Sequence, residues 1–301
     1  MNQSPAVAVI GLGRMGAGMA ATLLRHGYHV YGVDPVGVSE DLQAGGLIAS
    51  ELEDVAQRAS TVVLSLPSSD ISREVLIGAN GIAEDLAARN GPNSVVIDMS
   101  TGDPRVAQEL ARRLDDLGVG FVDAPVSGGP KGARGGTMTA FVGGSAESVA
   151  RATPVLTALT SRCTEVGGPG NGQLAKLINN GLCAVHLAAA GEALALAEAW
   201  GAPPAKIFEA VNAASGRSAV TELNVPEWVL SGTFDSGFST GLMARDVGLA
   251  TGTAGALGID APLLNAALLQ WQRARESFGA DADFNRIVTS NRAVQEETPN
   301  D

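Results

Sequence analysis

The sequence predicts an α/β fold in which a mostly parallel sheet is followed by a long helix and an all-α domain. Short apolar runs typical of strands alternate with helical stretches up to about residue 165. Beyond that point a glycine-rich loop leads into one long apolar helix that ends near Trp200. These observations predict a doubly wound Rossmann domain over residues 1–165 and an all-α substrate-binding and dimerisation domain over residues 166–301.

The predicted strands are short and rich in β-branched residues. Residues 6–10 form a continuous apolar run, as expected for a strand that is covered on both faces of its sheet. The further strand runs are residues 28–34, 61–66, 94–98, 120–123 and 138–143. Helical spacing of apolar residues is found over residues 15–25, 104–117 and 146–159. This alternation predicts helices on both faces of the sheet.

Composition and charge argue against several classes of protein. The formal net charge of −12 is unfavourable for a nucleic-acid-binding surface. Neither Cys163 nor Cys183 has the spacing of a zinc ligand, so no metal site is expected. The apolar stretch 181–200 contains two glutamates and a histidine and is better read as a buried helix than as a membrane span. The first residues lack a basic region and a cleavage site, so we expect a cytoplasmic protein without a membrane partner.

A glycine-rich turn follows the first strand and opens the first helix, which is the context that a GxGxxG motif requires. Its residues are Gly11, Leu12, Gly13, Arg14, Met15 and Gly16. Gly11 permits the tight turn, Gly13 lets the backbone approach a pyrophosphate, and Gly16 lets the helix pack closely on the strand. Free N–H groups at the helix start would bind the phosphates. The turn predicts a dinucleotide site.

Asp34, at the end of the second predicted strand, indicates which dinucleotide is bound. A carboxylate at this position can accept hydrogen bonds from ribose hydroxyls and would repel a 2′-phosphate. Residues 35–38 contain no arginine that could bind such a phosphate. The sequence therefore predicts NAD rather than NADP as the cofactor, with the alternative that Asp34 only caps the turn before Pro35.

Two further loops follow predicted strands and are placed to contact the nicotinamide half of the cofactor. They are residues 66–69, Leu-Pro-Ser-Ser, and residues 98–101, Asp-Met-Ser-Thr. Ligands of open α/β sheets bind beyond the carboxyl ends of the strands. Ordinary connecting loops remain the alternative interpretation.

The segment 123–129, Asp-Ala-Pro-Val-Ser-Gly-Gly, is a candidate substrate-binding segment. Ser127, Gly128 and Gly129 offer successive backbone N–H groups and a hydroxyl, which can bind an anion such as a carboxylate. A simple turn would need the same two glycines.

The start of the long helix carries the candidate proton carrier. Lys176 and Asn180 are four residues apart and share one face of the helix, and Asn179 lies beside them. Apolar neighbours are expected to desolvate the Lys176 amine and lower its pKa, as proton exchange near neutral pH requires. The alternative is a lysine that extends its amine to solvent from a helix start.

Taken together, four stretches resemble the β-hydroxyacid dehydrogenases, which include 3-hydroxyisobutyrate dehydrogenase, tartronate semialdehyde reductase and threonate dehydrogenase. They are residues 11–16, residues 123–133 with Gly136 and Thr137, residues 170–180 and residues 242–250. The 6-phosphogluconate dehydrogenases usually have His at the position of Asn179, and the imine reductases lack the lysine found here as Lys176.

The resemblance implies a role for each candidate residue. Lys176 would be the catalytic acid/base, while Asn180 and the Ser127–Gly129 segment would hold the carboxylate of a small substrate, with Asn179 as a further substrate-binding residue. Leu66, Pro67 and Thr101 would line the NAD site. Arg245 stands where the family commonly has Lys, so a positive charge toward cofactor or substrate is retained with a planar, longer side chain.

The resulting prediction is a 3-hydroxyisobutyrate dehydrogenase-like enzyme that interconverts a short 3-hydroxy acid and its semialdehyde or keto acid. A tartronate semialdehyde reductase or threonate dehydrogenase-like enzyme is the first alternative, and a non-catalytic NAD-binding regulator is the second. The long apolar helix exceeds what a small helical domain needs to bury, so a homodimer or homotetramer is expected.

Overall fold

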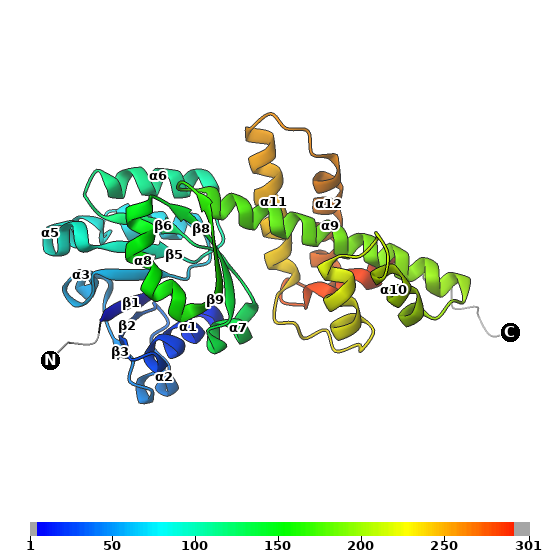
Figure 1. Cartoon of the computed structure of the whole chain (residues 1–301), viewed down its shortest axis with the longest axis horizontal. Helices are drawn as coiled ribbons and strands as arrows, with labels where there is room; N and C mark the ends of the chain where they lie inside the picture. Colours follow the sequence, from blue (N-terminus) through cyan, green and yellow to red (C-terminus); the bar gives the residue numbers. More distant parts are fainter. Residues whose placement is uncertain (1–4, 292–301) are drawn as a thin grey trace. The chain divides into compact units, whose positions relative to one another are not determined.

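The computed structural model of the chain describes residues 5–291. The chain forms two compact units, of which the first ends at Lys176 and the second begins at Leu177. Both residues lie in the long helix α9 (Asn171–Trp200), so the division falls inside a continuous helix (Figure 1). The sequence places its boundary at residue 165, before this helix.

The first unit is built on one sheet of nine strands in the described part of the chain. They are β1 (Ala6–Ile10), β2 (His29–Val33), β3 (Ile48–Ala49), β4 (Thr61–Leu64), β5 (Val95–Asp98), β6 (Gly120–Asp123), β7 (Val126–Ser127), β8 (Met138–Gly144) and β9 (Thr160–Gly167). Their order is β3-β2-β1-β4-β5-β6-β8-β7, with β9 paired to β8. Strands β1 to β6 pair in parallel, and β8 runs antiparallel to β6 and β7. The predicted mostly parallel Rossmann sheet is confirmed.

Helices cover both faces of this sheet. They are α1 (Arg14–Arg25), α2 (Glu40–Ala44), α3 (Val55–Arg58), α4 (Ser69–Ile77), α5 (Ala83–Asn90), α6 (Pro104–Asp115), α7 (Gly129–Gly135) and α8 (Ala146–Leu159). Alternate residues of β1 enter opposite cores: Val7 and Val9 pack with α1 and α8, whereas Ala8 and Ile10 pack with α5 and α6. The period of two along a strand explains this division, because successive side chains point to opposite faces.

The second unit is helical in its described part. Beyond α9 it contains α10 (Pro204–Asn212), a π-helix (Val220–Val229), α11 (Thr240–Ala256), α12 (Pro262–Phe278) and a 3-10 segment (Phe284–Asn291). Its core surrounds Trp271, which is fully buried and donates its Nε1–H to the Ala184 carbonyl of α9 at 3.3 Å. Leu187 and Val247 pack in the same cluster. The predicted all-α second domain is confirmed.

Strand β9 is the main element that the sequence pattern misses. Its residues from Ser161 to Glu165 are all exposed, so the strand lacks the apolar run by which the other strands are predicted.

Helix α9 also differs from the expectation of a buried helix. Among the described helices it alone is long and apolar enough to cross a membrane, and 39% of its most apolar window is buried. Several of its apolar side chains, including Leu196 and Trp200, are exposed.

Candidate cofactor and substrate site

The glycine turn between β1 and α1 has the geometry that its spacing predicts. Gly11 has a φ of +89°, and a Cβ there would lie 2.3 Å from the Ser65 carbonyl oxygen. A Cβ at Gly16 would lie 1.8 Å from the Gly11 carbonyl oxygen, so only glycine allows α1 to start this close to β1. At Gly13, by contrast, a Cβ would meet nothing within 4 Å. The two outer glycines are therefore required by packing, and the middle one leaves an open backbone surface.

Asp34 connects the end of β2 to this turn. Its Oδ2 accepts a hydrogen bond from the Leu12 N–H at 2.7 Å, and its Oδ1 accepts one from the Val36 N–H at 2.9 Å. The carboxylate therefore does cap the turn after β2 and also fastens the glycine turn. Two oxygens offer about four acceptor positions, so two remain for ribose hydroxyls.

The residues present fit a dinucleotide. Gly13 and Arg14 are exposed, while Leu12 and Met15 are partly buried against the core, so the backbone of the turn is accessible. The first N–H groups of α1 have no partner within the helix and point out of its N-terminus, where phosphate is favoured. This part of the site needs no rearrangement to accept a pyrophosphate.

The loops after β4 and β5 are linked to each other beside this turn. Leu66 donates its N–H to the Ser100 Oγ at 2.9 Å, and Ser100 donates its N–H to the Asp98 Oδ1 at 3.0 Å. Pro67 is exposed and Thr101 is partly buried. Because β1, β4 and β5 are parallel neighbours, Leu66, Pro67 and Thr101 lie at the same edge of the sheet as the glycine turn.

The segment after β6 differs in part from the predicted loop. Ser127 belongs to the short strand β7, where it pairs with Thr139 of β8. Gly128 and Gly129 have φ values of +123° and +60°, which strongly favour glycine. Ser127 and Gly129 are partly buried and Gly128 is exposed, so the backbone of this turn is accessible to a small ligand.

Two buried carboxyl groups stand at the ends of β5 and β6. Burial raises the pKa of Asp123 to about 7, against the lowering effect of hydrogen bonds from the Gln173 and Gly170 N–H groups. The nearby charge of Asp98 raises the Asp123 pKa further. Burial likewise raises the pKa of Asp98, which pairs with Asp123 in the register of the sheet. Both lie in segments that the sequence marks as candidate sites, 98–101 and 123–129, but the sequence assigns neither carboxyl group a role of its own.

Lys176 is buried near the start of α9, with an exposed fraction of 6%. Four residues further along the helix, Asn180 is also buried, whereas Asn179 is exposed. Within the second unit, the Asn180 Nδ2 donates to the Asp246 Oδ2 at 2.6 Å, and the Asn180 Oδ1 accepts from the Asn179 Nδ2 at 3.0 Å. Asn180 is thus held in one orientation.

Asp246 is a third residue to which the sequence assigns no role of its own. Besides binding Asn180, its Oδ1 accepts from the Arg245 Nη2 at 2.7 Å and from the Arg245 Nε at 3.0 Å. The positive charge predicted to face the cofactor or substrate is therefore paired with a buried carboxylate. The signal available in the sequence was the acidic residue next to Arg245 in an otherwise apolar helix.

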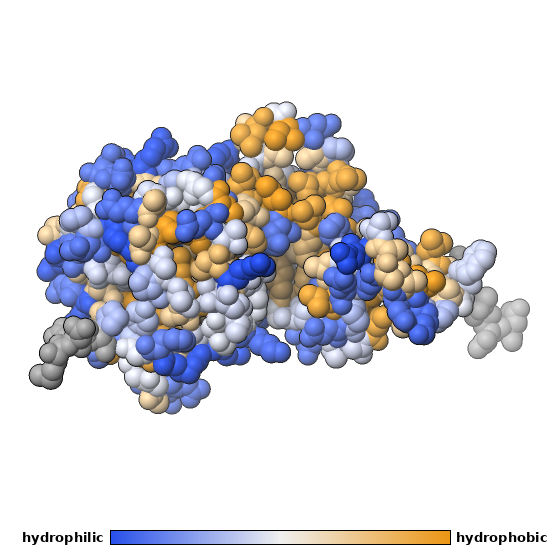
Figure 2. Space-filling view, in the orientation of Figure 1, coloured by the Kyte–Doolittle hydropathy of each residue, from blue (hydrophilic) through white to orange (hydrophobic). Residues whose placement is uncertain are grey.

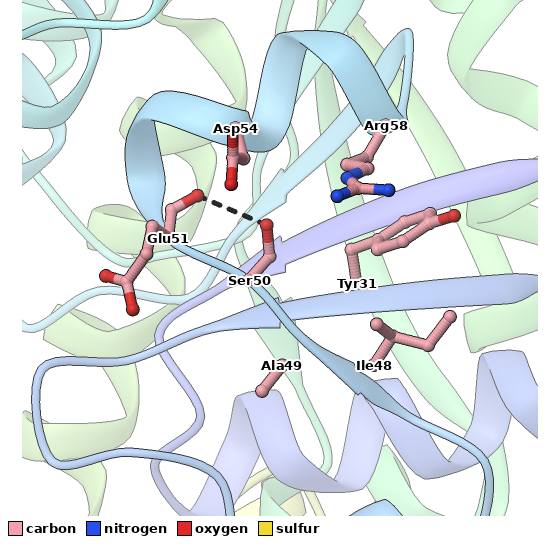
Figure 3. A pocket seen from close by; sticks show the side chains of 7 residues that line it. All are labelled: Tyr31, Ile48, Ala49, Ser50, Glu51, Asp54 and Arg58. Atoms are coloured by element: carbon pink, nitrogen blue, oxygen red, sulfur yellow. Dashed lines mark hydrogen bonds between the residues drawn. The ribbon is translucent and has the colours of Figure 1, made fainter.

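A small pocket of about 260 Å³ at the edge of the sheet near β3 is lined by none of these residues (Figure 3). Arg58 stacks over the Tyr31 ring, and Glu51 and Asp54 add acidic groups to the wall. Its volume is below the range of about 300 to 1,000 Å³ typical of sites for drug-sized ligands. Among residues 5–291, no group of three or more His, Cys, Asp or Glu side chains is placed to hold a metal ion.

Comparison with known protein families matches almost the whole chain. Residues 6–168 match the model described as the NAD binding domain of 6-phosphogluconate dehydrogenase. Residues 170–290 match the model described as NAD-binding of NADP-dependent 3-hydroxyisobutyrate dehydrogenase.

Individual relatives agree with these matches. The mitochondrial 3-hydroxyisobutyrate dehydrogenase of Rattus norvegicus is 40% identical over 82% of this chain and 75% of its own length. The 3-sulfolactaldehyde reductase of Escherichia coli (strain K12) is 35% identical over 94% of each chain. A solved structure of Mycobacterium tuberculosis 3-hydroxyisobutyrate dehydrogenase with L-serine has a TM-score of 0.87 and 31% identity, and covers 96% of this chain and 100% of that one. The chain therefore belongs to the β-hydroxyacid dehydrogenase family and is an NAD(P)-dependent oxidoreductase that acts on the CH–OH group of hydroxy acids.

Proposed function

We propose that the protein interconverts a short 3-hydroxy acid and its semialdehyde or keto acid, with NAD as the preferred cofactor and Lys176 as the acid/base. The observation that carries this proposal is the buried residue Lys176 one helical turn before the buried and oriented Asn180. A lysine is among the residues least often buried, so its burial here favours a chemical role over a solvated one.

Each group has a defined task in this reaction. The nicotinamide, when bound, supplies or accepts the hydride. In the oxidative direction, the neutral Lys176 Nζ takes the proton of the substrate hydroxyl, and in the reductive direction the protonated Nζ returns it. The Ser127–Gly129 segment, Asn179 and Asn180 bind the substrate carboxylate. Leu66, Pro67 and Thr101 face the cofactor, and Arg245 contributes positive charge toward cofactor or substrate.

Replacing Lys176 tests the assignment directly. Lys176→Ala should lower kcat by at least about a hundredfold, as removal of a general acid/base does, while the Kd for NADH, measured by fluorescence titration, changes little. Lys206→Ala, at an exposed lysine of α10, is the matched control. Wild-type turnover by the Lys176 variant would exclude the proposed role.

The substrate is proposed to be 3-hydroxyisobutyrate or a close analogue, because relatives with 40% identity carry that name. Tartronate semialdehyde and threonate are the alternative substrates. Because the chain is similar to a 3-sulfolactaldehyde reductase, 3-sulfolactaldehyde is a further compound to test. A panel of these compounds, with 3-hydroxyisobutyrate, glycerate and L-serine, should be ranked by kcat/KM from NADH absorbance. NADH binding without turnover of any of them would instead support the non-catalytic regulator.

We also propose that the protein is a cytoplasmic homodimer or homotetramer with no nucleic-acid or membrane partner. Exposed apolar side chains gather over α9, α12 and the loop between α11 and α12 of the second unit (Figure 2), which is typical of a surface that binds another protein. The net charge of −12 disfavours binding to nucleic acid or to anionic lipid. Cell fractionation and light scattering after size exclusion would test location and assembly.

A further inference from the structure

The first turn of α9 is fastened to the sheet by one carboxyl group. The Asp123 Oδ1 accepts the Gly170 N–H and its Oδ2 accepts the Gln173 N–H, both at 2.8 Å. N–H groups at a helix start have no partner within the helix, so a side chain that binds two of them determines where the helix begins. Asp123 is itself fully buried at the end of β6.

Two glycines allow this close approach. A Cβ at Gly143 of β8 would lie 2.7 Å from the Asp123 Oδ1. A Cβ at Gly172 would lie 2.4 Å from the Asp123 carbonyl oxygen and 2.5 Å from the Phe141 carbonyl oxygen. The helix start is thus packed directly on the backbone of β6 and β8, with no side chain between them.

The Gln173 side chain makes a second connection, to the loop after β5. Its Oε1 accepts the Gly102 N–H and its Nε2 donates to the Ser100 carbonyl, both at 2.8 Å. Gln173 is 2% exposed, so neither bond competes with water. These bonds hold the residues on either side of Thr101. Ser100 in turn accepts the Leu66 N–H through its Oγ. One side chain therefore joins α9 to both loops that face the cofactor.

Gln173 and Lys176 are three residues apart on α9, so they occupy neighbouring positions on one face of the helix. We infer that Gln173 and Asp123 are positioning residues, which together hold Lys176 at a fixed place relative to the cofactor-facing loops around Leu66 and Thr101. This inference rests on the proposed role of Lys176. Misplacing a reacting group by about 1 Å can lower the rate about a hundredfold, so such a fixed connection has a direct kinetic consequence.

Gln173→Met tests the inference, because methionine fills a similar volume and removes both side-chain hydrogen bonds. We expect kcat to fall by about 10- to 100-fold at temperatures where the variant is folded. The Kd for NADH should rise by about two- to tenfold, because the loop around Thr101 loses its anchors. Gln43→Ala is the control, since this exposed glutamine makes one long bond, 3.2 Å to the Val38 carbonyl, and should leave both constants unchanged.

Gln173→Glu gives a readout that a purely structural role would not produce. When ionised, the new carboxylate can accept from Gly102 but repels the Ser100 carbonyl; when protonated, it can donate to that carbonyl as the amide does. The ratio of kcat between this variant and the wild type should therefore rise as the pH falls from about 8 to about 5.5, since burial raises a carboxyl pKa from about 4.3. Comparing the ratio removes the pH dependence that is common to both proteins, while Asp123 and Asp98 are the other buried carboxyl groups near this position.

The possible results distinguish the proposed catalytic role of Lys176 from the positioning role of Gln173 and Asp123. Lost turnover in Lys176→Ala together with wild-type kcat in Gln173→Met, even with a lowered Tm, would overturn the positioning role alone. Wild-type turnover in Lys176→Ala would overturn the proposed function and this inference with it. If Gln173→Met does not fold, the inference is decided by Gln173→Glu, and a kcat ratio independent of pH contradicts it.

Discussion

At the scale of single residues, Asp34 has two tasks that a substitution can separate. Its carboxylate holds the Leu12 and Val36 N–H groups, and under the proposed preference for NAD it also repels a 2′-phosphate. Asp34→Asn keeps one side-chain acceptor and removes the charge. It should therefore lower the ratio of kcat/KM with NAD to kcat/KM with NADP by about 10- to 100-fold. The measurement is kcat/KM with each cofactor.

Asp34→Ala is the companion variant, because it removes the charge and both backbone bonds. We expect it to narrow the NAD preference similarly and to lower the Tm as well, whereas Asp34→Asn should have the smaller effect on Tm. An unchanged ratio of kcat/KM in both variants would show that Asp34 only fastens the glycine turn.

Asp123 predicts a pH dependence of stability. Its pKa in the folded protein, about 7, lies above the ordinary value of 3.8, so the folded state binds the proton more tightly than the unfolded state does. The resulting stabilisation is fully present below about pH 4, is lost as the pH rises to about 7, and is on the order of 4 kcal/mol. Asp123→Asn should remove this decrease in stability between about pH 4 and pH 7.

The test is the difference in unfolding free energy between Asp123→Asn and the wild type, from urea melts at several pH values. Asp98, the other buried carboxyl, faces Asp123 from β5, so the difference reports the titration of Asp123 together with its coupling to Asp98. A difference that stays constant between about pH 4 and pH 8 would show that Asp123 ionises in the folded protein much as it does in the unfolded chain.

The residues that the sequence reveals are those whose role is local. All the residues that define the glycine turn lie within a segment of six, and Asp34 lies at the position in the sequence that such a turn predicts. Gln173 and Asp123 are different, because their partners are 71 to 73 and 47 to 50 residues away in the sequence. Asp246 meets Asn180 across 66 residues. Only the folded sheet and helices bring these groups together, so a single sequence has no spacing that predicts them.

At the scale of elements, the junction of β1 and α1 predicts different effects for substitutions at Gly16 and Gly13. The first should lower stability, and the second should weaken cofactor binding. Gly16→Ala places a Cβ 1.8 Å from the Gly11 carbonyl oxygen, so α1 must shift and the stability should fall by about 1 to 3 kcal/mol. Gly13→Ala meets nothing within 4 Å and has an ordinary φ of −61°, so the Tm should hardly change.

Gly13→Ala should instead weaken NADH binding, because its methyl group occupies the open surface that the pyrophosphate approaches. Thermal melts and NADH fluorescence titration, made on both variants, distinguish the two effects. NADH affinity like that of the wild type in Gly13→Ala would place the pyrophosphate elsewhere.

Prediction at this scale succeeds where an element is buried. Strands β1, β4, β5 and β6 are apolar because helices cover both faces, and the sequence locates each of them. Strand β9 is exposed, and its polar residues pair with β8 through backbone groups that any sequence possesses. β3 has only two residues. Neither strand carries a pattern that distinguishes it from a loop.

At the scale of the whole molecule, the exposed apolar surface of the second unit predicts self-association. Leu182 of α9 and Leu263 of α12 are 53% and 71% exposed. A Cβ at Gly181 would lie 2.9 Å from the Leu264 side chain, so these two parts of α9 and α12 pack side by side, and Leu182 and Leu263 are the exposed residues next in sequence to this contact. A surface of this kind is typical of an interface between copies of one chain.

The double variant Leu182→Glu, Leu263→Glu should therefore lower the mass measured by light scattering to that of a smaller assembly. Because both side chains are exposed, the helical content of the folded chain should be unchanged in circular dichroism. Leu117→Glu, at a leucine of the first unit that is 37% exposed, is the control and should retain the wild-type mass. A double variant that keeps its full mass would mean that the copies meet through another surface.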